Sequence, residues 1–361
     1  MALTMAQIMA RARAPMPNSE TLRDEGAYRE IMQKGSKTFS LAARLFDRDR
    51  RFSAMLLYAW CRHCDDAIDV APNQEAALEA LDLLKTQTHL ALDVSSSSPR
   101  DLPMRALREI CQTHSIPSIY PLELLNGMEM DTAGVRIRSE SDLKLYCYRV
   151  ASVVGLMMSH VMGVADPRAL RHAVDTGLAM QMTNIARDIE DDFNMKRIYI
   201  PDSWFAETGL ERPDVESGAR FIPQAFTEVV KRLVELADTY YASGRAGILY
   251  LPWRAAFAVA SAQRIYREIG IRVVKKRDQA WFSRTYVPLA RKLVLMSLAI
   301  CDVVMIKLRH RNQGSQNEIS NPAVIASHQL ADPVRSDNPT AATKSAQRFE
   351  LSEHVFRSTD L

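Results

Sequence analysis

The chain has 361 residues, 47% of them hydrophobic and 25% charged, which is the composition of a globular protein with a substantial core. Its net charge is only +3, much weaker than the basic excess expected of a nucleic-acid-binding protein. The 13 glycines and 16 prolines are too few for a fold with many tight β-turns, so the composition favours helices. The five cysteines are too scattered for a disulfide framework, which is consistent with a reducing cytosol.

The hydrophobic pattern predicts an all-α fold. Between residues 25 and 311, apolar side chains recur mostly every three or four positions, as on one face of a helix, and no alternating strand pattern stands out. This stretch is expected to form one helical domain. Residues 1–24 are expected to be a flexible segment. Their arginines follow the apolar part instead of preceding it, which is the wrong order for a secretory signal. Residues 312–361 are polar and are expected to form a disordered tail.

The two longest apolar runs, Val150–Ala165 and Leu293–Ile306, are interrupted by polar residues. Both fall short of the ~18 uninterrupted apolar residues that a membrane span requires. We therefore expect both runs to be buried core helices.

An acidic cluster lies in the segment Leu56–Val70. Because each residue of a helix advances by about 100°, one tyrosine, one arginine and three aspartates share a face. These residues are Tyr58, Arg62, Asp65, Asp66 and Asp69. A solvated acidic face, with Arg62 paired to a neighbouring aspartate, explains the pattern as well as a binding site does.

A second cluster follows in the segment Val174–Phe193. Asn184, Asp188 and Asp192 succeed one another at intervals of four residues, and no lysine intervenes on this face. Gln181 and Arg187 lie on the same side, and Gly177 is expected to leave room there for a ligand.

Stacked carboxylates repel one another unless a cation lies between them. Mg²⁺ suits such oxygen ligands, and it commonly binds carboxylates together with the phosphates of a substrate. Two helices of this kind facing each other would hold Mg²⁺ and a diphosphate, with Arg62 and Arg187 binding phosphate oxygens. The sequence contains no P-loop motif that would serve instead.

Several motifs together resemble the squalene/phytoene synthase family, with bacterial phytoene synthases the most similar. They occur in the family's order and cover the chain from about residue 33 to 311: SKTFSLAARLF (Ser36–Phe46), YAWCRHCDDAID (Tyr58–Asp69), LLNGMEMD (Leu124–Asp131), YCYRVASVVGLMM (Tyr146–Met158), QMTNIARDIEDD (Gln181–Asp192) and RIYIP (Arg197–Pro201). The resemblance implies a helical isoprenoid-synthase domain with a central cavity. It also implies a prenyltransferase that joins two geranylgeranyl diphosphates head to head, through prephytoene diphosphate, to phytoene.

The resemblance further implies roles for individual residues. Metal-binding positions are Asp65, Asp69, Asn184, Asp188 and Asp192, and the catalytic set adds Arg62, Asp66 and Arg187. Residues near the diphosphate are Ser36, Thr38, Arg62, Gln181, Arg187, Tyr266 and Arg284. Residues lining the prenyl cavity are Phe39, Tyr58, Tyr146, Val150 and Val154, although the spacing of the last three also suits an ordinary core stripe.

Two alternatives remain open. One is a squalene- or dehydrosqualene-type synthase that uses farnesyl diphosphate, and the other is a non-catalytic assembly factor of similar sequence. The expected cofactor is Mg²⁺ or Mn²⁺, without a nicotinamide. Because the product is a forty-carbon hydrocarbon, we expect a cytoplasmic protein that associates reversibly with the membrane surface. A downstream desaturase is the candidate acceptor of the product, and no nucleic-acid partner is expected.

Overall fold

The computed structural model describes residues 24–35, 46–164, 166–209, 211–213, 223–280 and 284–318. The chain divides into two compact units, Met1–Val303 and Val304–Leu361. The first unit contains all the helices discussed below except the end of α16. Its described part is helical and contains no strand, so the all-α prediction is confirmed.

The described helices follow one another along the chain in two halves. The first half contains α3 (Glu25–Gly35), α5 (Arg48–Asp69), α6 (Gln74–Leu92), α7 (Leu102–His114), α8 (Ile119–Thr132), α9 (Glu140–Cys147), the π-helix η1 (Tyr148–Ser152) and α10 (Val153–Val161). The second half contains α11 (Pro167–Arg187), α12 (Ile189–Asn194), α13 (Asp202–Glu207), α14 (Pro223–Ala246), the 3₁₀-helices η2 (Gly247–Tyr250) and η3 (Arg277–Ala280), α15 (Trp253–Lys276) and α16 (Leu289–Glu318).

Local capping fixes where the two motif-bearing helices begin. The side chain of Asp47 accepts a hydrogen bond from the backbone N–H of Arg50 at the start of α5. Asp166 likewise accepts from the N–H of Arg168 at the start of α11, where Pro167 occupies the first helical position. Both are favourable N-terminal arrangements. They set the register of the aspartates that follow in each helix.

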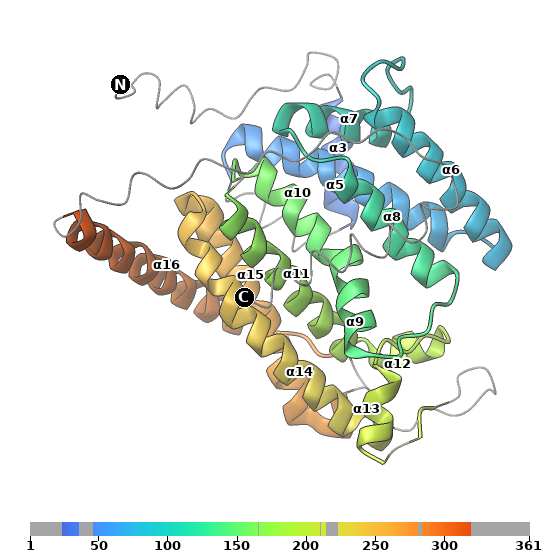
Figure 1. The fold of residues 1–361 in the computed structure, drawn as a ribbon, viewed down its shortest axis with the longest axis vertical. Coiled ribbons are helices and arrows are strands. Elements are labelled where there is room, and N and C mark those ends of the chain that lie inside the picture. Colours follow the sequence, from blue (N-terminus) through green and yellow to red (C-terminus); the bar gives the residue numbers. More distant parts are fainter. Residues whose placement is uncertain are drawn as a thin grey trace. The chain divides into compact units, whose positions relative to one another are not determined.

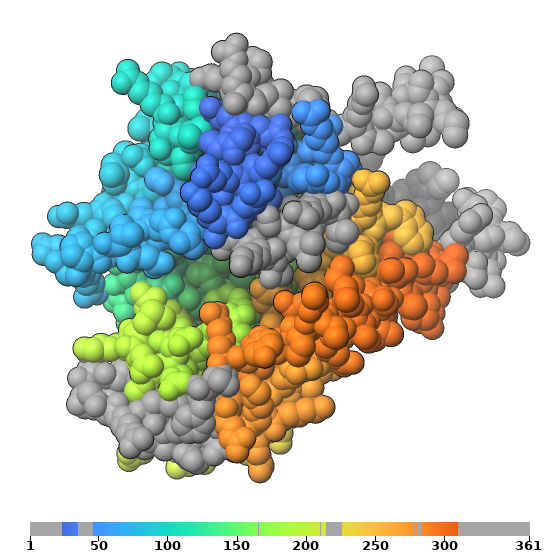
Figure 2. Space-filling view, turned by 180° about the vertical axis from the view of Figure 1, so that it is seen from behind, coloured from blue at the N-terminus to red at the C-terminus, as the bar shows by residue number. Residues whose placement is uncertain are grey.

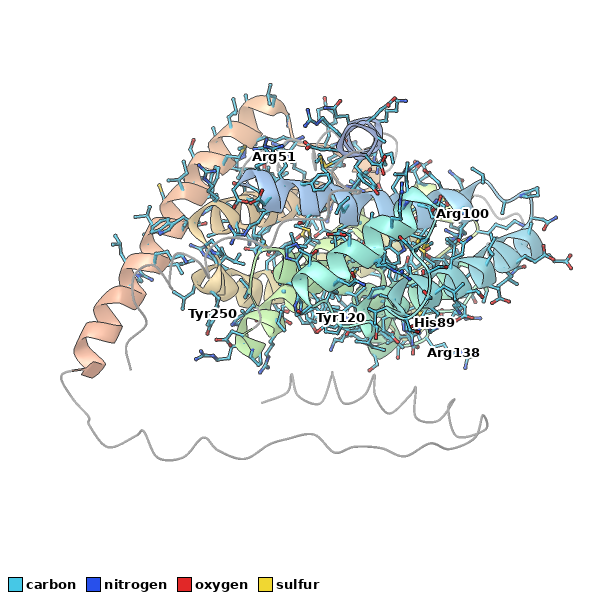
Figure 3. All side chains as sticks on the ribbon, turned by 90° about the horizontal axis from the view of Figure 1, so that it is seen from above. Arg51, His89, Arg100, Tyr120, Arg138 and Tyr250 are labelled. Carbon is cyan, nitrogen blue, oxygen red and sulfur yellow. The ribbon has the colours of Figure 1, made fainter. Side chains whose placement is uncertain are left out.

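Helix α11 lies at the centre of the first unit. It packs against α14, α15, α10 and η1. Figure 1 shows α10 and α11, in green, between the blue and cyan helices α5 to α8 and the yellow helices α14 and α15. The side chains of the described residues fill the spaces between these helices (Figure 3). The largest fully buried ones include Trp60 of α5 and Trp204 of α13.

The π-helix η1 is held between two glycines on neighbouring helices. A Cβ on Gly177 of α11 would lie 2.4 Å from the Cα of Ser152, and one on Gly127 of α8 would lie 2.7 Å from Val150 Cγ1. The Ser152 hydroxyl also donates to the carbonyl of Val174, at 2.8 Å. A side chain at position 177 would therefore meet backbone of η1, while Gly177 itself lines the apolar cavity of the candidate site, so it does border a space for a ligand.

The two apolar runs differ in the structure. In α10, Val153, Leu156 and Met157 are buried, as predicted for a core helix. The prediction of a buried helix is wrong for Leu293–Ile306, because only one side of α16 faces the protein and many of its apolar side chains are exposed. No helix in the described ranges is long and apolar enough to cross a membrane.

The tail was predicted to begin at residue 312, but helix α16 continues to Glu318. The boundary between the two compact units lies earlier, after Val303. No proline interrupts the helical sequence before Pro322. The rest of the predicted tail lies outside the described residues.

We expect a pH-dependent loss of stability from His114 of α7. Burial lowers its pKa from 6.5 to about 4, and its Nε2 lies 2.8 Å from the Ser53 hydroxyl. The fold therefore favours neutral His114, and this contribution is present above pH 6.5 and is lost as the pH falls towards 4. A shift of this size corresponds to stability on the order of 3 kcal/mol.

Urea unfolding of wild type and His114→Gln at pH 7 and pH 5 checks this expectation. The wild type should lose more stability than the variant between these two values. His89→Gln is the control, because His89 is exposed on α6 (Figure 3). Equal losses in all three proteins would contradict the prediction.

Candidate active site

The first carboxylate cluster lies along the last turns of α5. Arg62 pairs with Asp66, with Nε 3.0 Å from Oδ2 and Nη2 2.5 Å from Oδ1. Asp65 is free of this pair, and desolvation followed by the charge of Asp69 raises its pKa to about 6. The interpretation of Arg62 as the partner of a neighbouring aspartate is thus correct for Asp66, while Asp65 and Asp69 lie close enough for their charges to interact.

The second cluster spans a slight break between α11 and α12. Asp188 has φ −101° and ψ 18°, which ends α11 and separates Asp192 into α12. The backbone N–H of Asp188 still donates to the Asn184 carbonyl at 2.9 Å, and that of Asp192 to the Asp188 carbonyl at 2.8 Å. The expected stack of Asn184, Asp188 and Asp192 is therefore preserved although the helix is not continuous.

Two arginines bind Asp188. Arg187 Nε lies 2.7 Å from Oδ1, and its Nη2 contacts Oδ2. Arg284, far along the chain, approaches the same carboxylate with Nε 3.2 Å from Oδ1 and Nη2 3.3 Å from Oδ2. Tyr266 of α15 lies close enough to interact electrostatically with Arg187. The fold thus brings predicted residues from three segments together at one carboxylate.

Asp131 of α8 lies between the two clusters. It accepts hydrogen bonds from the hydroxyls of Tyr146, at 3.1 Å, and Tyr199, at 2.6 Å, whose rings stack with centroids 4.6 Å apart. Burial raises the pKa of Asp131. Its charge contributes in turn to the raised pKa values of Asp65 and Asp192.

The candidate-residue sets from the sequence omitted Asp131, Tyr199 and Arg197. Arg197 interacts electrostatically with Asp131 and with Asp192, and it lowers the pKa of both. The signal was available, because Asp131 ends the LLNGMEMD motif and the other two residues belong to RIYIP. Neither motif stacks acidic residues on one face, so helical periodicity did not single them out.

Negative charge accumulates at this site. For Asp192, burial and then the charges of Asp188 and Asp131 raise the pKa to about 8. Within the described residues, no three His, Cys, Asp or Glu side chains lie close enough to hold a metal ion on their own. A cation here would need further ligands.

Asn184 supplies an observation that favours such a cation. Its Oδ1 is buried without a hydrogen-bond partner, while its Nδ2 donates to Gln181 Oε1 at 3.3 Å. A buried acceptor without a donor is costly. Amide and carboxylate oxygens are ligands that hard divalent cations accept, with water and phosphate completing the shell. The residues present therefore fit a divalent metal that arrives with a diphosphate.

An apolar cavity of about 420 Å³ adjoins this polar region. Gln181 and Asn184 are its amide-bearing wall, and η1, α10, α11, α14 and α15 supply most of the remaining surface. Its lining includes Phe46, Val150, Val154, Met158, Met162, Met180, Leu251 and Val259. The size is typical of small-molecule sites.

The remaining predicted residues have different positions. Val150 and Val154 line the cavity. Tyr146 is buried against Asp131 and Tyr199 and does not belong to the cavity lining. Tyr58 is half-buried beside Arg62 and Asp65. Ser36, Thr38 and Phe39 lie outside the described residues.

A model of the family described as "Squalene/phytoene synthase" matches residues 32–292 of the chain. The chain belongs to the squalene/phytoene synthase family. It is 41% identical over 276 residues to a 15-cis-phytoene synthase of Enterobacter agglomerans, covering 74% of this chain and 92% of that protein. It is 38% identical to a 15-cis-phytoene synthase of Pantoea ananas, covering 78% and 92% of the two chains.

The fold agrees with solved structures of squalene/phytoene synthases. A dehydrosqualene synthase in complex with ligand superimposes with a TM-score of 0.68 at 27% identity, covering 78% of this chain and 96% of that one. Members of the family are isoprenoid synthases that use diphosphates and generally a divalent metal. The chain is thus an enzyme of the prenyltransferase type.

Proposed function

We propose that the protein is a Mg²⁺-dependent phytoene synthase. It would condense two geranylgeranyl diphosphates head to head, through the cyclopropyl intermediate prephytoene diphosphate, to phytoene, with release of two diphosphates. The observation that carries this proposal is the apolar cavity, whose amide wall of Gln181 and Asn184 belongs to the second cluster. The similarity to curated phytoene synthases supports the choice of substrate class.

The residues of this chain would divide the work between a polar and an apolar region. Arg62, Arg187 and Arg284 would bind the diphosphate oxygens once a ligand displaces the carboxylates they now contact. Asp65, Asp69, Asn184, Asp188 and Asp192 would hold Mg²⁺ or Mn²⁺. The metal supplies charge neutralisation for the departing diphosphate.

The cavity walls would protect the carbocations formed when diphosphate leaves. Val150 and Val154 offer no nucleophile, and apolar walls limit capture of a cation by water. Polar groups along the cavity, apart from the Gln181 and Asn184 wall, are few. This arrangement separates the ionisation of the substrate from the stabilisation of its hydrocarbon chain.

Product analysis tests the proposal. The purified protein is incubated with geranylgeranyl or farnesyl diphosphate, with and without NADPH, and the product masses are determined. We expect a forty-carbon hydrocarbon from geranylgeranyl diphosphate, independent of NADPH. A thirty-carbon product formed preferentially from farnesyl diphosphate would establish a squalene- or dehydrosqualene-type synthase. No product from either substrate would favour the non-catalytic alternative.

Removal of the metal is expected to abolish turnover. Without a cation the two aspartate clusters repel a diphosphate, so activity after dialysis against EDTA should fall below about 1% of the untreated value. Added Mg²⁺ or Mn²⁺ should restore it, and a thermal melt should show that the apoprotein remains folded. Undiminished turnover after dialysis would contradict the metal assignment.

We further propose that the enzyme works at the surface of the cytoplasmic membrane. Phytoene is a hydrocarbon, and its release into water is unfavourable by about 0.8 kcal/mol for each CH₂ group exposed. Reversible association with lipid would let the product enter the bilayer, where a desaturase is the candidate acceptor. Turnover in the presence and absence of vesicles, at low and moderate salt, tests this requirement.

A further inference from the structure

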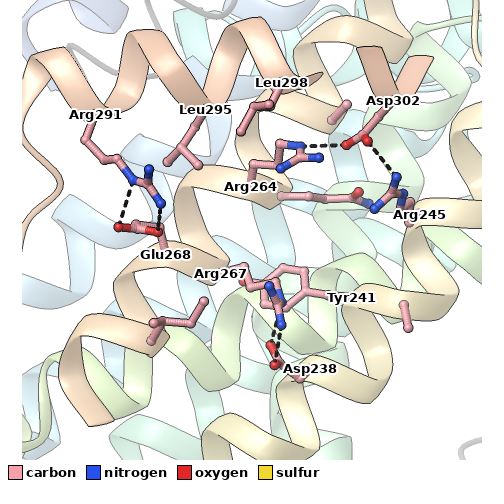
Figure 4. Close-up of a pocket in the computed structure, with 14 residues that line it drawn as sticks. Asp238, Tyr241, Arg245, Arg264, Arg267, Glu268, Arg291, Leu295, Leu298 and Asp302 are labelled. Carbon is pink, nitrogen blue, oxygen red and sulfur yellow. Dashed lines mark hydrogen bonds and ion pairs between the residues drawn. The ribbon is translucent and has the colours of Figure 1, made fainter. Parts of the chain in front are cut away.

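The charged side chains Arg291 and Asp302 of helix α16 form ion pairs with α14 and α15. Asp302 is only 3% exposed and accepts hydrogen bonds from Arg245 of α14 and Arg264 of α15, both at 2.5 Å. Arg291 forms a bidentate pair with Glu268 of α15, at 3.1 and 3.0 Å (Figure 4). These pairs line a cavity of about 550 Å³ between α14, α15 and the first part of α16. Long polar side chains thus share this contact with the buried Leu295 and Ala299 of α16.

The opposite side of α16 is apolar and exposed. Leu293 is 56% and Ile300 53% accessible. With about 100° per residue, the exposed apolar positions extend over roughly half of the helix circumference. We name this surface the α16 outer face, made of Leu289, Leu293, Val294, Leu298 and Ile300. Figure 2 shows this part of α16, in orange, on the surface of the molecule.

A single exposed leucine is ordinary, but a contiguous set is not. In α16 the inward side combines the buried Asp302 with Leu295 and Ala299, while the outward side presents a second set of apolar side chains. This pattern suits a surrounding medium that is itself apolar.

The charges beside the α16 outer face indicate which apolar medium it meets. Between Leu289 and Val303, Asp302 is the single acidic residue and is buried, whereas Lys292 lies beside the apolar positions and Arg291 is paired with Glu268. The remainder of α16, considered by itself, has exposed Val304, Met305 and Leu308 and adds Lys307 and Arg309 without a new acid before Glu318. Exposed apolar residues with basic neighbours are characteristic of helices that lie in the interface of an anionic bilayer.

We infer that the α16 outer face is the surface by which the protein docks on membranes that contain anionic lipids. The inference rests on the proposed function, because docking would serve to deliver the water-insoluble product to the membrane. Helix α15 borders both the prenyl cavity and the space beneath α16. Ala258 and Val259 line the cavity, and Arg264 and Arg267 line the space beneath α16. One helix therefore separates the prenyl cavity from the docking surface.

Cys301 provides a reporter on this helix. It is the exposed one of the five cysteines, all of which lie in described segments. Burial raises the pKa of Cys61, Cys64, Cys111 and Cys147, which disfavours their reaction with a thiol reagent. An environment-sensitive fluorophore can therefore be attached selectively to Cys301 of the full-length protein.

The test compares binding to vesicles of phosphatidylcholine with 30% phosphatidylglycerol, on the order of the anionic content that attracts basic segments, and to phosphatidylcholine alone. We expect a blue shift of the fluorophore and cosedimentation with the anionic vesicles, both weakened by salt. The double variant Leu293→Ser/Ile300→Ser should reduce the vesicle partition constant at least tenfold. Because both side chains are exposed, its melting temperature should stay near that of the wild type.

A matched control removes two leucines with the same spacing elsewhere. Leu83 and Leu90 of α6 are 58% and 54% exposed and also lie seven residues apart. Leu83→Ser/Leu90→Ser should bind vesicles as the wild type does. Equal binding by all three proteins, or no binding by the wild type, would overturn the inference. The inference would also be overturned if the double variant of α16 lost self-association in analytical ultracentrifugation but kept vesicle binding. In that case the α16 outer face would bind a second copy of the protein.

Product formation in detergent micelles separates the two hypotheses. A protein that forms phytoene but does not bind vesicles retains the proposed function and refutes the docking surface. A protein that binds vesicles through α16 but forms no product in micelles retains the surface and refutes the proposed function.

Discussion

Asp188→Asn is expected to lower turnover with geranylgeranyl diphosphate by at least two orders of magnitude, which corresponds to about 2.7 kcal/mol of lost transition-state stabilisation. Asn has nearly the same shape but lacks the negative charge that Arg187 and Arg284 contact and that the proposed metal would need. Because the Asn184–Asp188–Asp192 backbone bonds do not involve the side chain, the helix should be unaffected. Steady-state kinetics at saturating Mg²⁺, together with a thermal melt, measure the two effects.

Asp191→Asn is the matched control for this variant. Asp191 belongs to the same acidic run but its side chain is exposed, in contrast to the half-buried Asp188. It should retain turnover within a few-fold of the wild type. Similar large losses in both variants would show that the general charge of the segment matters rather than the position of Asp188. Normal turnover in Asp188→Asn would refute the assignment of this carboxylate.

Gly177→Ala is expected to destabilise the fold by about 1–3 kcal/mol or more, as overpacking in a tight core does. The added Cβ would lie 2.4 Å from Ser152 Cα and 2.7 Å from Ser152 N, and a backbone cannot move aside as the tip of a flexible side chain can. Val150 belongs to η1 and Val154 to the first turn of α10, and both line the cavity. Any shift of this segment should therefore also alter the cavity wall. Chemical unfolding and the KM for the substrate measure these effects.

Gly26→Ala provides the comparison. Gly26 lies in α3, is exposed, and has no atom within 4 Å of the position of a Cβ. Alanine should stabilise this helix by roughly 0.5–1 kcal/mol, because glycine loses more backbone entropy on folding. The two substitutions are chemically identical, so opposite signs isolate the close approach of η1. A neutral or stabilising effect of Gly177→Ala would contradict this packing.

Local periodicity was sufficient for those features that depend on neighbours along the chain. The apolar spacing of three and four residues predicted an all-α protein, and the same arithmetic placed Asn184, Asp188 and Asp192 on one face. It also revealed the Arg62–Asp66 pair as one of two interpretations. Interactions between residues three or four apart are encoded locally, and a helix needs no tertiary partner to bring them together.

Features that depend on contacts between distant segments required the tertiary structure. Asp131 of α8 interacts electrostatically with Asp65 and Asp192, and it binds the hydroxyls of Tyr146 and Tyr199, only because segments far apart in the chain pack together. The side of α16 that would be buried could not be read from Leu293–Ile306, because that run is apolar around most of the helix. In the structure the ion pairs of Asp302 and the burial of Leu295 lie on the inward side, and Leu293 is left exposed. The sequence by itself determined which residues share a helix face, whereas the packing of one helix against another decided which face meets protein, ligand or solvent, since helical periodicity carries no information about the neighbour.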